Sequence, residues 1–341
     1  MAILAAAGDI GGLRALVPAL ERLTADGGRV YLWDHRDLPA ALPALPRVKN
    51  IPRDARCTVF STSVADTVPL ELARRSRAAG LRVECVLDNW MNYRRRLEMD
   101  GAGLFVPDAY YVMDELARTR AIDEGLPPEI VMVSGHPGLA DLAPPAPDAR
   151  RVLRRRIAEL MGFDAGVELI VWVSEPAGRE QGAGYTEEQA LGELCSAVRA
   201  NGGPWAICVL AHPREDRALV QVAWARRSLG LPGGVLPRGD ISSRDAVGAA
   251  NAVAGMTSIL LYESWLLGRP TLSLQPGLVR DDLRIYRARQ GVFCVETAQE
   301  RPRIAAWLEQ AKEGASPPRP ELETHRGAAL RLAGAWRPYS L

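Results

Sequence analysis

Short apolar runs alternate with amphipathic segments from the first residue of this chain onwards. The intervening segments, such as 13–23 and 70–79, repeat their apolar positions at helical spacing and are long enough for helices. Strands that alternate with helices are typical of βα units around a parallel sheet. The predicted strands of the first half are residues 2–7, 29–33, 57–61, 81–87, 110–113 and 130–133. The pattern therefore predicts an open, doubly wound α/β sheet.

A proline-rich stretch interrupts the alternation at residues 142–148, where three prolines stand within seven residues. Proline fixes φ and lacks a backbone N–H, so this stretch suits a stiff linker and not a helix interior. We expect two domains, residues 1–142 and 149–320, and a last helix at 323–335 within the C-terminal segment 321–341. The elements predicted for the second domain are helices at 149–161, 186–200, 217–229 and 259–267 and strands at 168–173, 205–211, 235–236, 252–254 and 271–274.

Composition and charge narrow the class of protein. The 341 residues are 48% hydrophobic and 24% charged, as in an ordinary soluble globular protein, and they exceed what one core usually organises. Lys plus Arg number 42 and Asp plus Glu 41, so the net charge of +1 offers no long-range field for nucleic acid.

Five scattered cysteines without a C-x-x-C pair predict buried thiols in a reducing cytoplasm and no metal site. The start lacks a basic segment and no apolar stretch reaches about 18 residues, so we expect neither export nor a membrane span.

A glycine-rich run, GDIGG at 8–12, follows the first predicted strand and opens a helix. Glycine lets the backbone approach a ligand, and a helix N-terminus attracts anions. The run does not match the G-x-G-x-x-G dinucleotide fingerprint, and only Asp34 supplies an acid at the end of the second strand. A tight strand-to-helix turn and a ligand-facing loop both stay open, and in the second case Asp9 is a candidate catalytic base.

The run AHPRE at 211–215 follows another apolar strand. In an open α/β sheet the carboxyl ends of the strands border the ligand crevice, so His212 and Arg214 would stand at its rim as donors for a phosphate. The alternative is a histidine that only ends the strand. The glycine-rich loop at 174–185 follows the first strand of the second domain and carries Arg179, a cation suited to phosphate groups.

The most specific pattern is Thr257-Ser258, then Glu263, then GRP at 268–270 before a strand. Two hydroxyls at a strand-to-helix turn, together with the dipole of the following helix, favour a phosphate. Glu263 lies five residues past Ser258, from where a carboxylate can accept the two hydroxyls of a ribose. The alternative is an N-cap followed by an incidental surface glutamate.

A polar and aromatic segment follows the fourth predicted strand, at 88–96. Its side chains suit a sugar through stacking and hydrogen bonding, and Asp88 is the first candidate for a catalytic base. The alternative is a solvated helix start with Asp88 or Asn89 as its N-cap. The predicted acceptor-binding residues are Asn89, Trp90, Asn92, Tyr93 and Arg94.

The pattern from Thr257 to Pro270 resembles the donor-binding segment of GT-B glycosyltransferases and their relatives, which include lipid A disaccharide synthase and the UDP-N-acetylglucosamine 2-epimerases. His212-Pro213 with a later hydroxyl pair is similar to motifs of bacterial sialyltransferases and CDP-glycerol glycerophosphotransferases. The resemblance implies two Rossmann-like domains that face a central cleft, with the last helix crossing back onto the first domain. His136, in the run VSGHP at 133–137, would then face that cleft as a third catalytic candidate, or else be a structural histidine.

The resemblance also implies an activity and its partners. It implies metal-independent glycosyl transfer without a cofactor, from a UDP-, CDP- or CMP-linked sugar on the second domain to a sugar, lipid-linked or protein acceptor, in bacterial surface glycan synthesis. Epimerisation or hydrolysis of a nucleotide sugar and binding without turnover are the alternatives. The basic run 150–156 is either a solvated helix face or a peripheral contact with anionic lipid or a phosphorylated acceptor.

Overall fold

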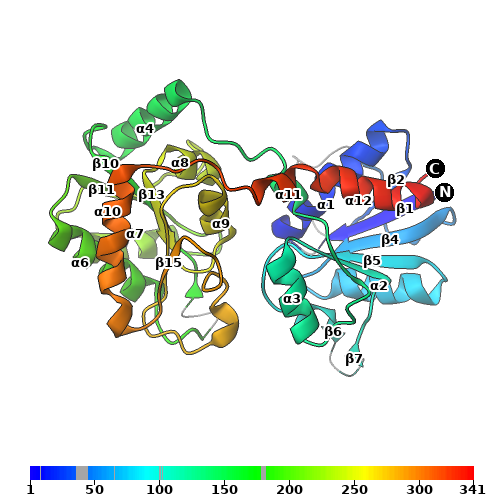
Figure 1. Ribbon diagram of the computed structural model, residues 1–341. Helices are drawn as coiled ribbons and strands as arrows, with labels where there is room; N and C mark the ends of the chain where they lie inside the picture. The colour runs from blue at the N-terminus through cyan, green and yellow to red at the C-terminus, as the bar shows by residue number, and fades with distance from the viewer. Residues whose placement is uncertain (8, 36–44, 65, 100, 102, 178–181) are drawn as a thin grey trace. The chain divides into compact units, whose positions relative to one another are not determined.

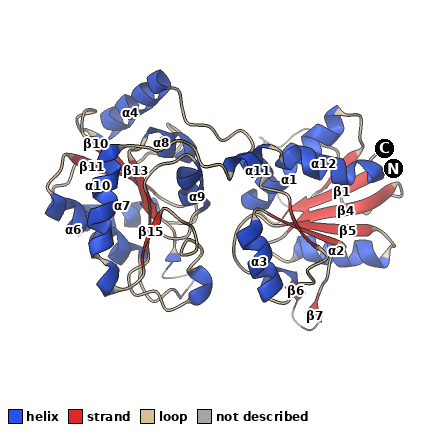
Figure 2. Cartoon of the chain, in the orientation of Figure 1, coloured by secondary structure: helices blue, strands red, loops and turns tan. Residues whose placement is uncertain are grey.

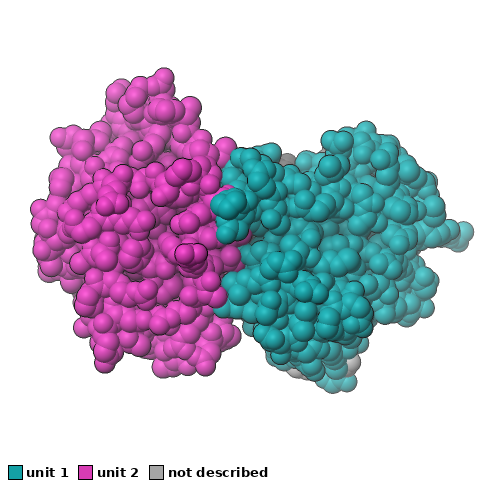
Figure 3. Space-filling model, in the orientation of Figure 1, with its two compact units in different colours: residues 1–142, 320–341 teal, residues 143–319 magenta. Residues whose placement is uncertain are grey.

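The computed structural model describes residues 1–7, 9–35, 45–64, 66–99, 101, 103–177 and 182–341. The chain divides into two compact units, which are Met1–Leu142 with Pro320–Leu341 (unit 1) and Ala143–Arg319 (unit 2). Figure 3 shows the two units in separate colours. Each unit is built on a parallel sheet flanked by helices (Figures 1 and 2). The predicted fold class, two Rossmann-like α/β domains, is confirmed.

The sheet of unit 1 has the strand order β3-β2-β1-β4-β5-β8-β9, and its neighbouring strands pair in parallel. The chain reverses direction across the sheet between β1 and β4, and ligands bind beside such a reversal at the carboxyl ends of the strands. The strands are β1 (Ala2–Ala7), β2 (Val30–Trp33), β3 (Arg47–Val48), β4 (Ala55–Ser61), β5 (Arg82–Val86), β8 (Ala109–Val112) and β9 (Val131–Val133). The helices are α1 (Ile10–Ala25), α2 (Val68–Ala78) and α3 (Glu115–Asp123), and β6 (Glu98–Met99) pairs with β7 (Gly103–Leu104) outside the sheet.

The sheet of unit 2 has the order β12-β11-β10-β13-β14-β15, again with parallel neighbours and with its reversal between β10 and β13. The strands are β10 (Glu168–Val173), β11 (Trp205–Leu210), β12 (Gly233–Val235), β13 (Ala252–Gly255), β14 (Thr271–Leu274) and β15 (Val292–Val295). The helices are α4 (Pro147–Met161), α6 (Glu187–Asn201), α7 (Arg217–Ser228), α8 (Ser243–Ala249), α9 (Ile259–Leu266) and α10 (Pro302–Glu313).

Continuous apolar runs form the central strands, because a parallel sheet covered on both faces buries both sides of each strand. Every residue of β1 is buried, as are the last five of β10, and both strands have the predicted bounds. The sequence prediction named no element at α3, α8, α10, β3 or β15. In α3 only Ala117 and Ala121 are buried, so that helix has almost no apolar periodicity to find.

The C-terminal segment packs on unit 1. Helix α12 (Ala328–Trp336) lies against α1, and its Leu332, Ala333 and Trp336 belong to the same core cluster as Ile3. The predicted single helix at 323–335 is instead two helices, α11 (Leu322–Arg326) and α12, separated at Gly327. Glycine is a weak helix former, which explains the break.

The basic run at 150–156 lies in α4 and contributes to the packing of unit 2. Arg150 and Arg154 donate hydrogen bonds to backbone carbonyls of that unit, so these two arginines are not simply solvated. Arg151 and Arg155 are exposed, and lipid contact stays a prediction for them. Within the part of the chain that the structure describes, no helix is both long and apolar enough to cross a membrane.

Candidate functional site

Polar side chains gather at the carboxyl ends of three neighbouring strands in unit 2. Strands β11, β10 and β13 are adjacent in the sheet, so the loops that follow them meet at one edge. Ser174 and Glu175 follow β10, His212 follows β11, and Thr257 follows β13. The fold therefore brings the two predicted donor-site patterns, at 211–215 and 257–258, to the same edge of one sheet.

Glu215 ties the loop after β11 to the loop after β10. Its Oε2 accepts a hydrogen bond from the backbone N–H of His212 at 2.7 Å, and its Oε1 accepts one from the Ser174 hydroxyl at 2.8 Å. Because both carboxylate oxygens are engaged, Glu215 fixes His212 relative to β10. The sequence prediction gave Glu215 no role, although its place three residues after a strand-end histidine was an available signal.

The imidazole of His212 is held as a neutral hydrogen-bond donor. Its Nδ1 accepts a hydrogen bond from the backbone N–H of Arg214 at 3.2 Å, which places the proton of the neutral ring on Nε2. Burial, followed by the charges of Arg214 and Arg238, lowers the pKa of His212 to about 4. At neutral pH the ring is therefore uncharged and offers an Nε2–H group that suits a phosphate oxygen.

We expect His212 to remain neutral in solution from pH 8 down to pH 5. Long-range ¹⁵N NMR correlations should keep the pattern of the Nε2–H form over this range, because the folded pKa is about 4. The spectrum of His212→Gln identifies which signal belongs to this ring. A titration midpoint near the ordinary histidine value of about 6.5 would contradict the half-buried, hydrogen-bonded ring.

The Thr257-Ser258 pair opens α9, as predicted, and the donors of Thr257 are already engaged. Ser258 is the N-cap, and its hydroxyl accepts a hydrogen bond from the backbone N–H of Leu260 at 3.3 Å. The backbone N–H and the hydroxyl of Thr257 donate to the carboxylate of Glu175 at 2.6 and 3.0 Å. Ser258 is therefore an N-cap residue, as the alternative interpretation predicted. Thr257 binds the carboxylate of Glu175.

Glu263 is not accessible to a ribose, so the prediction that its carboxylate binds the ribose hydroxyls is corrected. It is fully buried, and its two oxygens accept hydrogen bonds from Nε and Nη2 of Arg244 at 2.7 and 2.9 Å. Arg244 belongs to α8, which packs beside α9, and it keeps 35% of its side chain exposed. The exposed polar group at this place is therefore a guanidinium. The sequence prediction missed it because only the packing of the two helices pairs these residues.

A pocket of about 600 Å³ borders this edge between α6 and α7. Arg214, which is exposed, is one of its polar lining residues. The polar lining comprises Ser174, Thr186, Glu187, Glu188, Arg214, Glu215, Asp216 and Arg226. Pockets of this size take small molecules. Its apolar wall comprises Pro176, Leu191, Leu219, Val220, Val222 and Ala223. Arg179, the predicted cation for the donor phosphates, lies outside the described residues.

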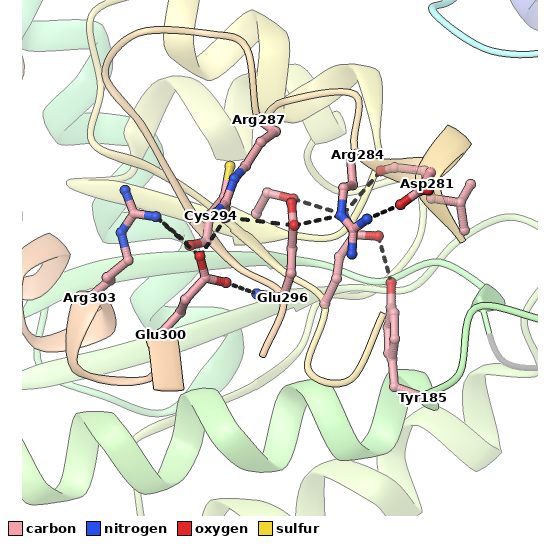
Figure 4. A network of polar contacts seen from close by, with 11 residues as sticks. Tyr185, Asp281, Arg284, Arg287, Cys294, Glu296, Glu300 and Arg303 are labelled. Carbon is pink, nitrogen blue, oxygen red and sulfur yellow. Dashed lines mark hydrogen bonds and ion pairs between the residues drawn. The ribbon is translucent and has the colours of Figure 1, made fainter. Parts of the chain in front are cut away.

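A second polar network lies after β14 and β15, at the same edge of the sheet (Figure 4). The hydroxyl of Tyr185 donates to Oε1 of Gln275 at 3.1 Å. Glu296 accepts a hydrogen bond from Nε of Arg284 at 2.8 Å, and Arg287 lies 3.6 Å from the same carboxylate. Carboxylates thus compensate these arginines, which stabilise the loops after β14 and β15. The sequence prediction did not identify this network.

In unit 1, Asp88 forms a buried ion pair at the carboxyl end of β5. Its Oδ1 lies 2.5 Å from Nη1 of Arg96, and the two side chains are 9% and 6% exposed. Arg96 also donates to the carbonyl of Thr62 at 2.8 Å. The guanidinium of Arg96 therefore occupies the carboxylate that the sequence offers as the first candidate for the base. A Cβ atom at Gly11 would collide with Asp88, which explains the glycine in the loop after β1.

Asp9 lies near this ion pair and is better suited to accept a proton. It is the N-cap of α1, and its Oδ1 accepts a hydrogen bond from the backbone N–H of Gly12 at 2.8 Å. Burial, followed by the charge of Asp88, raises the pKa of Asp9. A carboxylate with a raised pKa binds a proton more readily than an ordinary aspartate, as a general base requires.

The sequence prediction missed a histidine–carboxylate pair near Asp9. Nε2 of His35 lies 2.8 Å from Oδ2 of Asp66, whose other oxygen accepts a hydrogen bond from the backbone N–H of Val68 at 3.1 Å. His35 follows β2 and Asp66 follows β4, so only the sheet brings them together. Among the residues that the structure describes, no cluster of His, Cys, Asp or Glu side chains is arranged to hold a metal ion.

Trp90 and Tyr93 are core residues, which corrects the expectation that they stack on an acceptor. Each is 1% exposed. Nε1 of Trp90 donates to Oδ2 of Asp114 at 2.9 Å, and the carbonyl of Tyr93 accepts a hydrogen bond from the hydroxyl of Tyr110 at 3.1 Å. Local sequence does not separate an aromatic ring in a ligand wall from one in the core, because burial depends on neighbouring strands.

The other three predicted acceptor residues lie in the turn after β5. Oδ1 of Asn89 accepts a hydrogen bond from the backbone N–H of Met91 at 3.0 Å, and Asn92 has a φ of 59°. Arg94 is exposed and its Nε donates to Glu98 at 2.7 Å. Asn89 and Asn92 are partly exposed, so acceptor binding by these three residues stays a prediction.

His136 is buried within unit 1, which corrects the expectation that it faces a ligand. It is 2% exposed, and burial lowers its pKa to about 3. Its backbone N–H donates to Nδ1 of His325 at 2.9 Å and so connects β9 to α11. A ring enclosed in this way does not reach a substrate. His136 is therefore a structural histidine, which was the alternative to a catalytic role.

No protein-family model and no curated protein matches the sequence. Among solved structures, the chain is similar to UDP-GlcNAc 2-epimerase from Neisseria meningitidis bound to UDP-GlcNAc, at 11% identity and a TM-score of 0.67 over 98% of this chain and 99% of that chain. It is also similar to the UDP-GlcNAc 2-epimerase of Methanocaldococcus jannaschii in complex with UDP-GlcNAc and UDP, at 10% identity and a TM-score of 0.67 over 98% and 100%. HepE of Anabaena in complex with UDP-glucose matches at 13% identity and a TM-score of 0.59 over 98% and 95%. At these identities the likeness shows the fold, which is GT-B, as the sequence resemblance implies.

Proposed function

We propose that this chain is an enzyme that binds a nucleotide-activated sugar at the carboxyl edge of the unit 2 sheet and transfers the sugar to a hydroxyl acceptor. One observation carries the proposal: the neutral donor His212 and the N-terminus of α9 at Thr257 and Ser258 follow the two strands that flank β10. Both features favour phosphate oxygens. Structures of the neighbours hold UDP, UDP-glucose or UDP-GlcNAc, which supports a uridine nucleotide.

The proposed donor site consists of groups that are held in place before the ligand arrives. The nucleotide phosphates accept hydrogen bonds from Nε2–H of His212 and from the turn at Thr257 and Ser258, and the exposed Arg214 adds positive charge. Preorganised donors of this kind stabilise the charge that develops on a leaving phosphate. Arg244, held by the buried Glu263, is an additional cation near α9.

Asp9 is the proposed catalytic base. It takes the proton of the acceptor hydroxyl while the acceptor oxygen bonds to the sugar C1 and the bond from C1 to the phosphate oxygen breaks. The raised pKa of Asp9 supports this role, and the nearby charge of Asp88 contributes to that rise. Asp88 is therefore a positioning residue in this proposal, through its charge and its pairing with Arg96.

Epimerisation or hydrolysis of a nucleotide sugar is the second candidate function, and the similarity to several UDP-GlcNAc 2-epimerases favours it. The two functions differ in what they need. An epimerase or hydrolase converts the donor alone, whereas a transferase requires an acceptor. Incubation with UDP-GlcNAc alone, followed by NMR of the sugar, separates them.

Replacing His212 by alanine should weaken UDP binding by roughly ten- to hundredfold, because a hydrogen bond to a charged group typically contributes about 1.5–3 kcal/mol. Isothermal titration calorimetry measures the change. His212→Gln is the matched control, since its amide keeps a donor near the position of Nε2 and should retain most of the affinity. Equal affinity in wild type and His212→Ala would remove His212 from the site. Failure of the wild type to bind UDP, CDP, CMP, GDP or dTDP would overturn the proposed function.

A further inference from the structure

A carboxylate of the protein occupies the N-terminus of α9. Oε2 of Glu175 accepts a hydrogen bond from the backbone N–H of Thr257 at 2.6 Å, and its Oε1 accepts one from the Thr257 hydroxyl at 3.0 Å. Two donors of Thr257 therefore already hold one anion, in the place where the proposed function needs a phosphate.

The position of Glu175 is set by the sheet of unit 2 and not by α9. Glu175 follows β10 next to Ser174, whose hydroxyl donates to Glu215 at 2.8 Å, and it precedes Thr257 by 82 residues. Glu175 is partly exposed as a residue, and its carboxylate is buried against Thr257. The carboxylate can leave Thr257 while β10 and α9 stay folded, because the contact joins two loops and crosses no strand.

We propose that Glu175 is an internal competitor of the ligand phosphate, which must displace this carboxylate from α9 before it can bind there. The inference rests on the proposed function. A carboxylate and a phosphate offer similar anionic oxygens to the same N–H and O–H donors, and their like charges repel each other. Phosphate binding is then an exchange, and its affinity is lower than the donors of the turn would otherwise give.

The charged groups around Glu175 determine how its competition with phosphate should change with pH. Burial raises the pKa of Glu175, and the charge of Glu215 raises it further. Tyr185 and Tyr286 also face the carboxylate, and burial raises the pKa of both phenols, so they stay neutral. Proton uptake removes the charge of Glu175 and weakens its hold on Thr257. The competition should therefore decrease as the pH is lowered from 8 to 5.

The test compares wild type, Glu175→Gln and Glu175→Ala as full-length proteins, by calorimetric titration with inorganic pyrophosphate and with UDP at pH 7.5. Removing the carboxylate charge should tighten the binding of both probes by roughly ten- to hundredfold, the equivalent of charge-assisted hydrogen bonds. Glu159→Gln makes the same charge change at an exposed position of α4 and should leave both affinities unchanged. At pH 5.5 the difference between wild type and Glu175→Gln should become smaller.

Each outcome decides between the possible roles of Glu175. A purely structural role predicts a lower Tm with equal or weaker anion binding in both variants, which would overturn the inference, as would a lack of pyrophosphate binding by all three proteins. Tighter pyrophosphate binding by the variants without any UDP binding would keep the inference and overturn the proposed function. Equal UDP binding by all three proteins would keep the proposed function and overturn the inference.

Discussion

Replacing Arg96 by methionine should lower the free energy of unfolding of unit 1 by about 3–5 kcal/mol, because it leaves the carboxylate of Asp88 buried without its partner. Both side chains are less than 10% exposed, so water does not replace the lost guanidinium. The carbonyl of Thr62 also loses a hydrogen bond of 2.8 Å. Urea unfolding followed by tryptophan fluorescence and circular dichroism measures the loss.

Two further variants show whether the unpaired charge causes the effect. Arg95→Met changes an exposed arginine in the same turn and should shift the stability by less than about 0.5 kcal/mol. Combining Arg96→Met with Asp88→Leu removes both charges and should recover part of the loss. A loss below about 1 kcal/mol for Arg96→Met alone would show that Asp88 does not depend on this arginine.

Replacing Trp336 by alanine should cost about 3–5 kcal/mol of the stability of unit 1, as is typical for a large aromatic ring removed from a core. Trp336 is fully buried, packs edge-on to Tyr111 with the ring centroids 6.5 Å apart, and donates through Nε1 to Oε2 of Glu84 at 2.9 Å. Truncation leaves a cavity between α12 and the sheet and takes one hydrogen bond from the buried Glu84.

Hydrogen exchange measured by mass spectrometry separates this effect from a general loss of stability. Protection should fall across β1, β4 and β5, which belong to unit 1, and should stay unchanged in β10 and β11, which belong to unit 2. Leu330→Ala, at a position of α12 that is 62% exposed, is the matched control and should change little. Unchanged protection of unit 1 in Trp336→Ala would mean that the C-terminal segment does not stabilise it.

Local sequence determined the elements of the fold and the chemistry at their ends. The apolar runs of β1 and β10 are short, uninterrupted and followed by helical periodicity, so they predict parallel strands with the observed bounds. Ser258 predicts the start of α9, because its hydroxyl accepts a bond from the backbone a few residues ahead. Strand bounds and helix caps depend on residues that are close together along the chain, so the local sequence is enough to predict them.

The tertiary structure determined which polar groups remain available to bind a ligand. Glu263 and Arg244 pair because α8 packs against α9, and Glu175 reaches Thr257 because β10 and β13 are adjacent in the sheet. His136 is enclosed in unit 1, whereas the sequence left open whether it faces a ligand or is structural. Hydrogen-bond pairing and burial depend on residues that are distant in the chain and close in space. The pattern of residue types therefore predicted that the proposed donor-site residues would meet at one sheet edge. Only the tertiary structure determined which of their atoms already have hydrogen-bond partners.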